Sequence, residues 1–148
     1  MRTGASTDPG NDVYLVDTSA WIEVFRKGSR ITVDDLVEDR DAIVTCLPVI
    51  QEVLQGFDDE RAFQIARTAM RALPCVEAPL TMALTERAVD IYRRTRRIGL
   101  TVRSSVDCLI AACAVRHHLT VVHHDRDFAA IAKVIALEHV DLAPRARR

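Results

Sequence analysis

The sequence predicts an α/β fold of three layers, in which a central parallel sheet is covered by helices on both of its faces. Three observations predict this fold. Short, mainly apolar runs of strand length recur along the chain, most of them are followed by a longer segment with helix signals, and the first run, at residues 13–16, is apolar throughout. Strands that alternate with helices form parallel sheets, and continuous apolar runs are typical of strands that are buried on both faces.

Five runs are expected to be strands, and the segments between them carry helix signals. Ser19, Asp58, Ser104 or Ser105, and Asp125 are residues that can cap a helix N-terminus. The expected strands are residues 13–16, 42–45, 74–77, 119–123 and 134–137. The expected helices are residues 19–26, 33–39, 48–55, 59–72, 81–97, 105–117 and 125–133.

The length and composition of the chain suit one domain of ordinary size. The chain has 148 residues, of which 49% are hydrophobic, so it can bury a core without disulfides. We expect one globular domain over residues 12–142, preceded by a disordered leader (residues 1–11) and followed by a basic tail (residues 143–148). No segment resembles a signal peptide or a membrane span, so a cytoplasmic protein with no membrane partner is expected.

The charge balance gives no global argument for nucleic-acid binding. Lys plus Arg is 20 and Asp plus Glu is 21, so any affinity for RNA must come from a local basic patch. The four cysteines lie singly, and the histidine pairs His117/His118 and His123/His124 are adjacent residues that cannot face one metal ion together. A structural zinc site is therefore not expected.

Four acidic side chains fall where the predicted fold brings separate segments together. Asp17 directly follows the first strand, and Asp125 follows the strand at 119–123 by two residues. Asp107 lies in the first turn of one helix and Glu52 in the first half of another. Ligands of open parallel sheets bind beyond the carboxyl ends of the strands, and the helix starts point to that same edge. The four carboxylates are thus predicted to meet there.

The sequence around these acids is apolar. Asp107 opens an almost wholly apolar helix, Glu52 has apolar residues on both sides, and Asp17 follows an apolar strand. Converging carboxylates near a core repel one another, so cations of the protein or a divalent metal ion must offset their charge. Oxygen ligands favour Mg²⁺ or Mn²⁺ over zinc. Taken singly, each acid is also compatible with a structural role, such as a helix cap or a dipole partner.

The segments that contain these acids have distinctive sequences. In order and spacing they resemble the four acidic motifs of PIN-domain proteins, and more narrowly those of the VapC-type toxins of bacterial toxin–antitoxin pairs. The resemblance spans nearly the whole globular part. The segments are LVDTSAWI at 15–22, VIQEVLQG at 49–56, VDCLIAA at 106–112 and HDRDF at 124–128.

This resemblance implies a PIN-like domain over residues 12–142 and an Mg²⁺- or Mn²⁺-dependent endoribonuclease. The implied substrate is structured RNA, such as a tRNA or rRNA stem-loop. The resemblance also implies a cognate antitoxin, a homodimer, and a heterotetramer or larger assembly with that antitoxin.

Carried over motif by motif, the resemblance makes Asp17, Glu52, Asp107 and Asp125 the catalytic acids. Asp17 and Asp107 are expected to be direct ligands of the principal metal ion. Glu52 and Asp125 would hold a second ion, act through water or orient the nucleophile. Asp127 is an alternative fourth ligand, because it precedes a phenylalanine in the same motif; Asp125 is preferred because it comes first after the strand.

Other side chains are candidates for supporting roles. Thr18 or Ser19 can place a hydroxyl near the metal ion. Five arginines can engage phosphates near the site, although a solvated helix face explains them equally well. These are Arg93, Arg94, Arg96, Arg97 and Arg103.

Two other functions compete with this hypothesis. The first is a PIN-like module that binds RNA or a protein without catalysis, which would not need the acidic cluster. The second is a phosphohydrolase that uses an Asp-x-Asp nucleophile after its first strand. Position 19 is Ser instead of Asp, which argues against that chemistry.

Overall fold

The computed structural model describes residues 12–37 and 42–142, so the expected leader (residues 1–11) and tail (residues 143–148) lie outside the described residues. The strands form one parallel sheet in the order β3-β2-β1-β4-β5. They are β1 (Tyr14–Val16), β2 (Ile43–Cys46), β3 (Cys75–Val76), β4 (Thr120–His123) and β5 (His139–Asp141).

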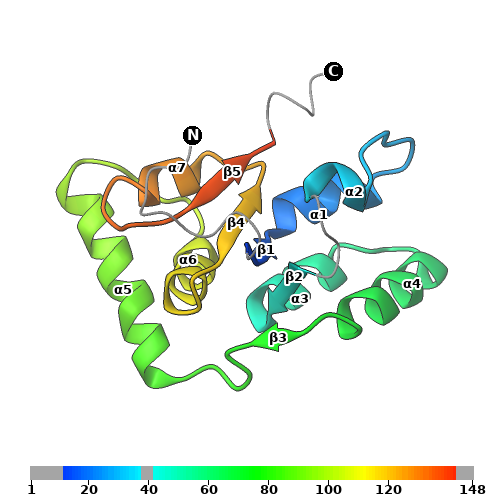
Figure 1. Cartoon of the computed structure of the whole chain (residues 1–148), viewed down its shortest axis with the longest axis horizontal. Coiled ribbons are helices and arrows are strands. Elements are labelled where there is room, and N and C mark those ends of the chain that lie inside the picture. Colours follow the sequence, from blue (N-terminus) through cyan, green and yellow to red (C-terminus); the bar gives the residue numbers. More distant parts are fainter. Residues whose placement is uncertain (1–11, 38–41, 143–148) are drawn as a thin grey trace.

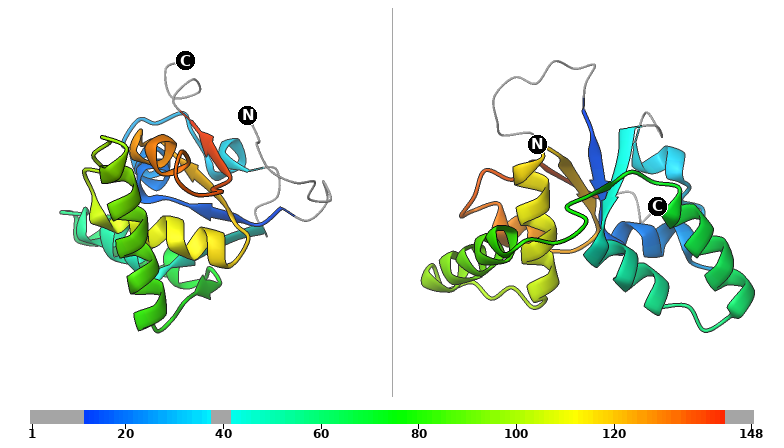
Figure 2. Two further views of the ribbon diagram at one scale, coloured as in Figure 1. Left: turned by 90° about the vertical axis from the view of Figure 1, so that its left-hand side faces the viewer. Right: turned by 90° about the horizontal axis from the view of Figure 1, so that it is seen from below.

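Helices cover both faces of this sheet (Figures 1 and 2). The helices are α1 (Thr18–Phe25), α2 (Val33–Leu36), α3 (Leu47–Gln55), α4 (Glu60–Arg71), α5 (Met82–Arg97), α6 (Ser105–Arg116) and α7 (Asp127–Ile131). On one face α3 packs against both α1 and α4, and on the other α5, α6 and α7 pack against one another. This arrangement confirms the predicted α/β/α fold.

The carboxyl ends of the two central strands lie side by side. Leu15, Val16, Val121 and Val122 are all fully buried, as expected for strands with helices on both faces. Val16 is paired with Val122 in the parallel register, and the backbone N–H of Asp17 donates to the Val122 carbonyl at 2.9 Å. The turns that follow β1 and β4 are therefore held next to each other.

The prediction of a strand at residues 134–137 is wrong. The backbone N–H groups of Val134 and Ile135 donate to the Ile131 carbonyl at 3.0 and 3.2 Å, so the chain continues to turn after α7. Leu137 is buried as a loop residue. The apolar character of this segment reflects packing of a loop on the core, and β5 forms further along the chain, where it can pair with β4.

Most helices lie within one residue of their expected bounds, and α1, α2 and α7 show the differences that have a clear physical cause or extent. Asp17 instead of Ser19 caps α1, because its side chain accepts the Ser19 N–H. α7 begins at Asp127, and Asp125 caps the preceding turn by accepting the Asp127 N–H. α2 ends at Leu36, and residues 38–39 of the helix expected at 33–39 lie outside the described residues.

The described surface retains apolar side chains on several helices. Ile22 on α1, Ile65 on α4 and Val89 on α5 are 52%, 61% and 53% exposed. Among the described residues, no helix combines the length and the apolar sequence that crossing a bilayer requires.

Candidate metal centre

Asp17 is fixed at the end of β1 by hydrogen bonds from Ser19. Its Oδ2 accepts the Ser19 backbone N–H at 3.0 Å and the Ser19 hydroxyl at 2.5 Å. The Ser19 Oγ also accepts the backbone N–H of His124 at 2.8 Å, which ties the turn after β1 to the turn after β4. Ser19 therefore orients a carboxylate and joins the two central turns.

Glu52 reaches the same edge of the sheet from α3. The Thr18 hydroxyl donates to Glu52 Oε1 at 3.0 Å. Because Thr18 directly follows Asp17, this bond holds the Glu52 carboxylate near Asp17. Pro48 occupies the first turn of α3, where a missing N–H is tolerated.

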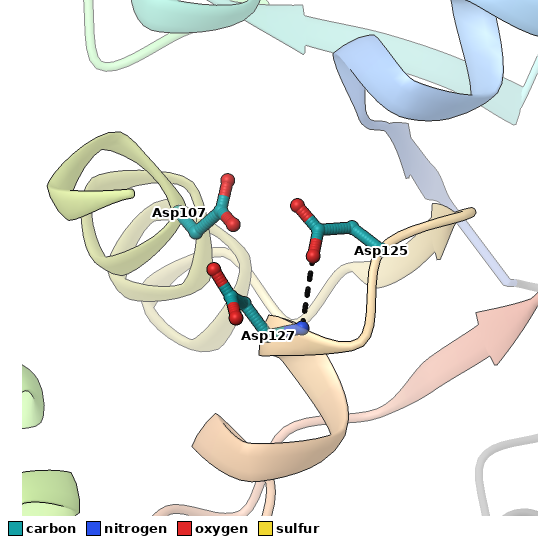
Figure 3. A group of neighbouring side chains, drawn as sticks. All are labelled: Asp107, Asp125 and Asp127. Carbon is teal, nitrogen blue, oxygen red and sulfur yellow. Dashed lines mark hydrogen bonds between the residues drawn. The ribbon is translucent and has the colours of Figure 1, made fainter. Parts of the chain in front are cut away.

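Asp107, Asp125 and Asp127 form a tight group of carboxylates (Figure 3). One oxygen from each lies within 4.8 Å of the others. Asp107 is in the first turn of α6, Asp125 is in the loop after β4 and Asp127 begins α7. Asp107 and Asp127 are each only 3% exposed. Two segments far apart in the sequence, the start of α6 and the turn after β4, therefore bring their carboxylates together, as in oxygen-ligand sites for hard cations.

The two candidates for the fourth ligand, Asp125 and Asp127, have different surroundings. Asp127 Oδ2 accepts the backbone N–H groups of Arg103 and Ser104 at 2.9 and 3.4 Å, so it also shapes the loop that leads into α6. Asp125 is half-buried, and its Oδ1 accepts the Asp127 N–H at 2.9 Å. These bonds use one oxygen of each carboxylate, so both residues can turn the other oxygen toward a cation.

Burial and mutual repulsion raise the pKa of two of these acids. Burial raises the pKa of Asp107 to about 9, and a hydrogen bond with the Asp125 carboxyl and the neighbouring negative charges act in the same direction. Burial also raises the pKa of Asp17 to about 6; hydrogen bonds from Ser19 oppose this rise and the charge of Glu52 adds to it. At neutral pH and without a cation, Asp107 therefore retains a proton that metal binding would displace.

Two buried carboxylate oxygens indicate where a cation fits. Asp17 Oδ1 and Asp107 Oδ2 have no hydrogen-bond partner within the described ranges. A buried acceptor with no donor is destabilising, and a cation bound to either oxygen would remove the penalty at that oxygen. Asp17 is not one of the three carboxylates whose oxygens lie within 4.8 Å of one another. All of the candidate ligand atoms are carboxylate oxygens, which suit a hard divalent ion better than zinc. The residues present therefore fit a divalent metal ion.

The predicted RNA-binding arginines lie on α5 and in the loop before α6, and all five are exposed. Arg94 Nε pairs with Asp90 Oδ2 at 2.9 Å, and Arg96 Nη1 donates to the Thr101 hydroxyl at 3.4 Å. Arg103 is the arginine nearest the carboxylates in this set, because its backbone N–H binds one of them. Proximity to the acids thus singles out one member of the predicted patch.

A cavity of about 450 Å³ lies between α5 and α6, beside the loop that carries Arg103. Tyr92, Arg103 and Ser105 contribute to its lining, together with apolar side chains such as Val102 and Leu109. Arg96 follows Tyr92 by one helical turn and therefore lies on the same side of α5. The cavity and these arginines share one face of the protein.

His123 is a residue near the site that the sequence analysis missed. Its ring is fully buried and accepts the Asp125 backbone N–H. Burial, followed by the neighbouring His139, lowers the pKa of His123 to about 4. The sequence does carry a signal for this residue, because a histidine stands at the end of an apolar strand, two residues before an acid.

The chain has clear relatives of known family. Residues 14–134 match the family described as PIN domain. The sequence is 38% identical over 130 residues to VapC ribonuclease Mb1587 of Mycobacterium bovis and to ribonuclease VapC11 of Mycobacterium tuberculosis, covering 85% of this chain and 96% of each relative. Ribonuclease VapC51 of M. tuberculosis is 32% identical over 121 residues, covering 82% of this chain and 86% of that protein.

Solved structures of toxin–antitoxin proteins share the fold. DNA-bound VapBC from Salmonella typhimurium has a TM-score of 0.71 at 16% identity, covering 88% of this chain and 98% of the other. VapC20 of M. tuberculosis, a sarcin-ricin loop cleaving toxin, has a TM-score of 0.61 at 19% identity, covering 84% and 98%. The sequence matches and this common fold agree: the chain belongs to the PIN-domain family, within the group of VapC ribonucleases.

Proposed function

We propose that the protein is a metal-dependent endoribonuclease that acts as the toxin of a toxin–antitoxin pair, with Mg²⁺ or Mn²⁺ as its cofactor. The observation that carries this proposal is the convergence of Asp107, Asp125 and Asp127, whose oxygens lie within 4.8 Å of one another. Membership of the VapC ribonucleases supports the reaction, which is hydrolysis of phosphodiester bonds.

The proposed substrate class is structured RNA, in particular stem-loops of tRNA or rRNA. VapC20, which has the same fold, is described as a toxin that cleaves the sarcin-ricin loop. The sequence identity to VapC20 is 19%, so the support concerns the class of RNA and not the particular loop.

The direct ligands of the principal ion are proposed to be Asp17 and Asp107, because each has a buried oxygen with no donor among the described residues. Asp125 and Asp127 would complete the ligand set, because an oxygen of each lies within 4.8 Å of an Asp107 oxygen. When bound, a divalent ion lowers the pKa of a water ligand and polarises phosphate oxygens. The protein fixes these carboxylates before substrate arrives, because they stand on a strand end and on helix starts.

Glu52 has a different proposed role, because its carboxylate is held by the Thr18 hydroxyl beside Asp17. From that position it can orient the attacking water or accept its proton. Ser19 supports the site indirectly, since its hydroxyl orients Asp17. The five arginines would bind phosphates on either side of the scissile bond, with Arg103 nearest the acids.

The proposed partners are a cognate antitoxin and a second copy of the chain, in a heterotetramer or larger complex, and the proposed location is the cytoplasm. The fold shared with VapBC complexes from Salmonella typhimurium and Rickettsia felis supports an antitoxin partner. The Rickettsia felis structure has a TM-score of 0.70 at 17% identity, covering 87% of this chain and 98% of that chain. Exposed apolar side chains on α1 and α4, Ile22 and Ile65, offer contact area for such a partner.

The decisive test is cleavage of a labelled stem-loop RNA by purified protein with Mg²⁺, with Mn²⁺ or with EDTA. Cleavage is expected only with metal, and Asp17→Ala is expected to lower its rate by at least about 100-fold, because loss of a ligand weakens metal binding. Circular dichroism checks that the variant is folded, and growth arrest on expression provides a readout in cells.

Cleavage that persists in EDTA, or in Asp17→Ala at the parent rate, would contradict the proposal. A parent that binds the RNA but never cleaves it would favour a binding module.

Arg103→Ala is expected to weaken RNA binding without preventing metal binding. Each phosphate contact contributes about −0.9 to the slope of log affinity against log salt concentration for duplex nucleic acid, and somewhat less for single strands. The variant should therefore lower the magnitude of that slope by roughly 1. Filter binding over a salt series measures it. Arg67→Ala is the matched control, because Arg67 is an exposed arginine of α4 on the opposite face of the sheet. Equal slopes for parent and Arg103→Ala would exclude Arg103 from the RNA interface.

A further inference from the structure

His123 makes two polar contacts at the end of β4. Its side chain is fully buried. Nδ1 accepts a hydrogen bond from the backbone N–H of Asp125 at 3.2 Å, and Nε2 lies 2.9 Å from Nδ1 of His139 on β5. The imidazole ring therefore connects the acid-bearing loop to the neighbouring strand.

The hydrogen-bond pattern assigns one tautomer to each ring. A backbone N–H can only donate, so Nδ1 of His123 carries no hydrogen and its proton is on Nε2. That proton is donated to Nδ1 of His139, whose own proton is then on its Nε2. Both rings are neutral in this arrangement, because a proton on His139 Nδ1 would place two hydrogens between the facing nitrogens. By accepting that proton, His139 supports the tautomer in which the unprotonated Nδ1 of His123 faces Asp125.

Packing adds a second contact between His123 and the loop. The centroid of its ring lies 4.9 Å from that of Phe128, and the ring stacks on His139 with 5.1 Å between the centroids. Phe128 is fully buried and directly follows Asp127. His123 therefore contacts the chain on both sides of the turn that carries two carboxylates. Within that turn, the Asp127 N–H donates to Asp125 Oδ1 at 2.9 Å.

We propose that His123 is a positioning residue of the metal centre, which holds the Asp125 and Asp127 carboxylates toward the third carboxylate of the cluster, with His139 supporting its tautomer. The inference rests on the proposed function in so far as it treats these carboxylates as metal ligands. A histidine that only filled the core would need no acceptor facing Asp125. The acceptor nitrogen is therefore the feature to test.

Three substitutions separate these roles, because each keeps a different part of the imidazole. His123→Asn places an amide oxygen near the position of Nδ1 and can still accept the Asp125 N–H. His123→Gln places its polar atoms near the position of Nε2 and leaves Asp125 without that acceptor. His123→Leu keeps an apolar side chain of similar size and loses both polar contacts.

The affinity for Mn²⁺, measured by titration calorimetry on metal-free protein, is the primary readout. Removing an outer-shell partner of a metal ligand typically lowers metal affinity by about 10–100-fold. A loss of Mn²⁺ affinity in this range is expected for His123→Gln and His123→Leu. For His123→Asn, which keeps the acceptor, the expected loss is below about threefold. Cleavage rates of the same proteins should recover toward the parent value at saturating Mn²⁺, because the substitution weakens metal binding and removes no metal ligand.

Met70→Ala is the control for a purely structural effect. Met70 is fully buried in α4, on the other face of the sheet, so its truncation should lower the melting temperature and leave Mn²⁺ affinity unchanged. If His123→Leu does not fold, the comparison of His123→Asn with His123→Gln decides the question.

The inference is overturned if His123→Leu or His123→Gln binds Mn²⁺ as tightly as the parent, or if His123→Asn loses as much affinity as His123→Gln. A parent that binds Mn²⁺ but leaves RNA intact would contradict the proposed function alone, because the role of His123 is decided by metal affinity. A parent that binds no Mn²⁺ would contradict both.

Discussion

Asp107→Asn is expected to raise the stability of the metal-free protein and to lower RNA cleavage by about 1,000-fold or more. Asp107 is 3% exposed, and burial together with neighbouring carboxylates raises its pKa to about 9. Asparagine has nearly the same shape and does not ionise, so folding no longer requires a proton to be bound at this position. The amide of asparagine is a much weaker metal ligand than a carboxylate, so the transition state should lose several kcal/mol of stabilisation. At about 1.4 kcal/mol per tenfold in rate, this corresponds to the expected loss of cleavage activity.

The gain in stability is expected to grow with pH. The ordinary pKa of Asp107 is 3.8 and its folded-state pKa is about 9, so between these values the folded protein binds more protons than the unfolded chain. The stability of the metal-free parent therefore falls as the pH rises through this window. Asp17, with a folded-state pKa of about 6, adds to this fall over the lower part of the window. The variant lacks the contribution of Asp107, so the difference in melting temperature should widen from mildly acidic to mildly alkaline pH.

Thermal unfolding with EDTA and with Mn²⁺ measures both effects. Mn²⁺ should raise the melting temperature of the parent and have little effect on Asp107→Asn. Asp90→Asn is the matched control, because Asp90 is on α5 and pairs with Arg94 outside the acidic cluster; it should gain no stability and retain cleavage. An Asp107→Asn variant that is less stable than the parent in EDTA, or that cleaves RNA at the parent rate, would show that Asp107 is a structural carboxylate.

Asp127→Ala is expected to lower both stability and activity, in contrast to Asp107→Asn. The Asp127 carboxylate accepts two backbone N–H groups, those of Arg103 and Ser104. Hydrogen bonds to a charged group contribute about 1.5–3 kcal/mol each, and relief of repulsion in the cluster offsets part of their loss. A net destabilisation of about 2–3 kcal/mol lowers the melting temperature by roughly 10 °C in a chain of this size. Loss of these bonds also releases the loop that positions Asp107.

Asp127→Asn separates the two roles of this side chain. The amide oxygen can still accept from Arg103, so the melting temperature should remain close to that of the parent, whereas cleavage should be lost if Asp127 is a metal ligand. Asp125→Ala provides a comparison, because Asp125 is half-buried and its Oδ1 accepts one backbone N–H, that of Asp127, where Asp127 accepts two. Its effect on stability should be smaller. Full activity in Asp127→Asn would assign the fourth acidic position to Asp125.

The fold and the candidate acids were predictable because they depend on local patterns. The apolar runs that became β1, β2 and β4 are continuous, which indicates strands buried on both faces. Once a parallel sheet is assumed, Asp17 and Asp125 must lie at one edge, since they follow the carboxyl ends of parallel strands. Asp107 and Glu52 follow from the same geometry, because the helices that carry them start at that edge.

The last strand and the cap of α1 could not be read from local patterns. An apolar segment at 134–137 has the composition of a strand, but whether it pairs depends on the path of the chain after α7. Asp17 and Ser19 are both good helix caps, and the choice between them depends on the contact of Ser19 with His124 across the two central turns.

The layered fold, the family and the acids available for a metal centre could be inferred from the amino-acid sequence, because each is encoded in residue type and spacing. How these acids share the site depends on the folded structure. It showed that Asp127 is anchored to the loop before α6, that Asp17 and Asp107 each keep a buried oxygen with no donor among the described residues, and that His123 supports Asp125. These properties depend on contacts between residues far apart in the chain, which local spacing does not specify.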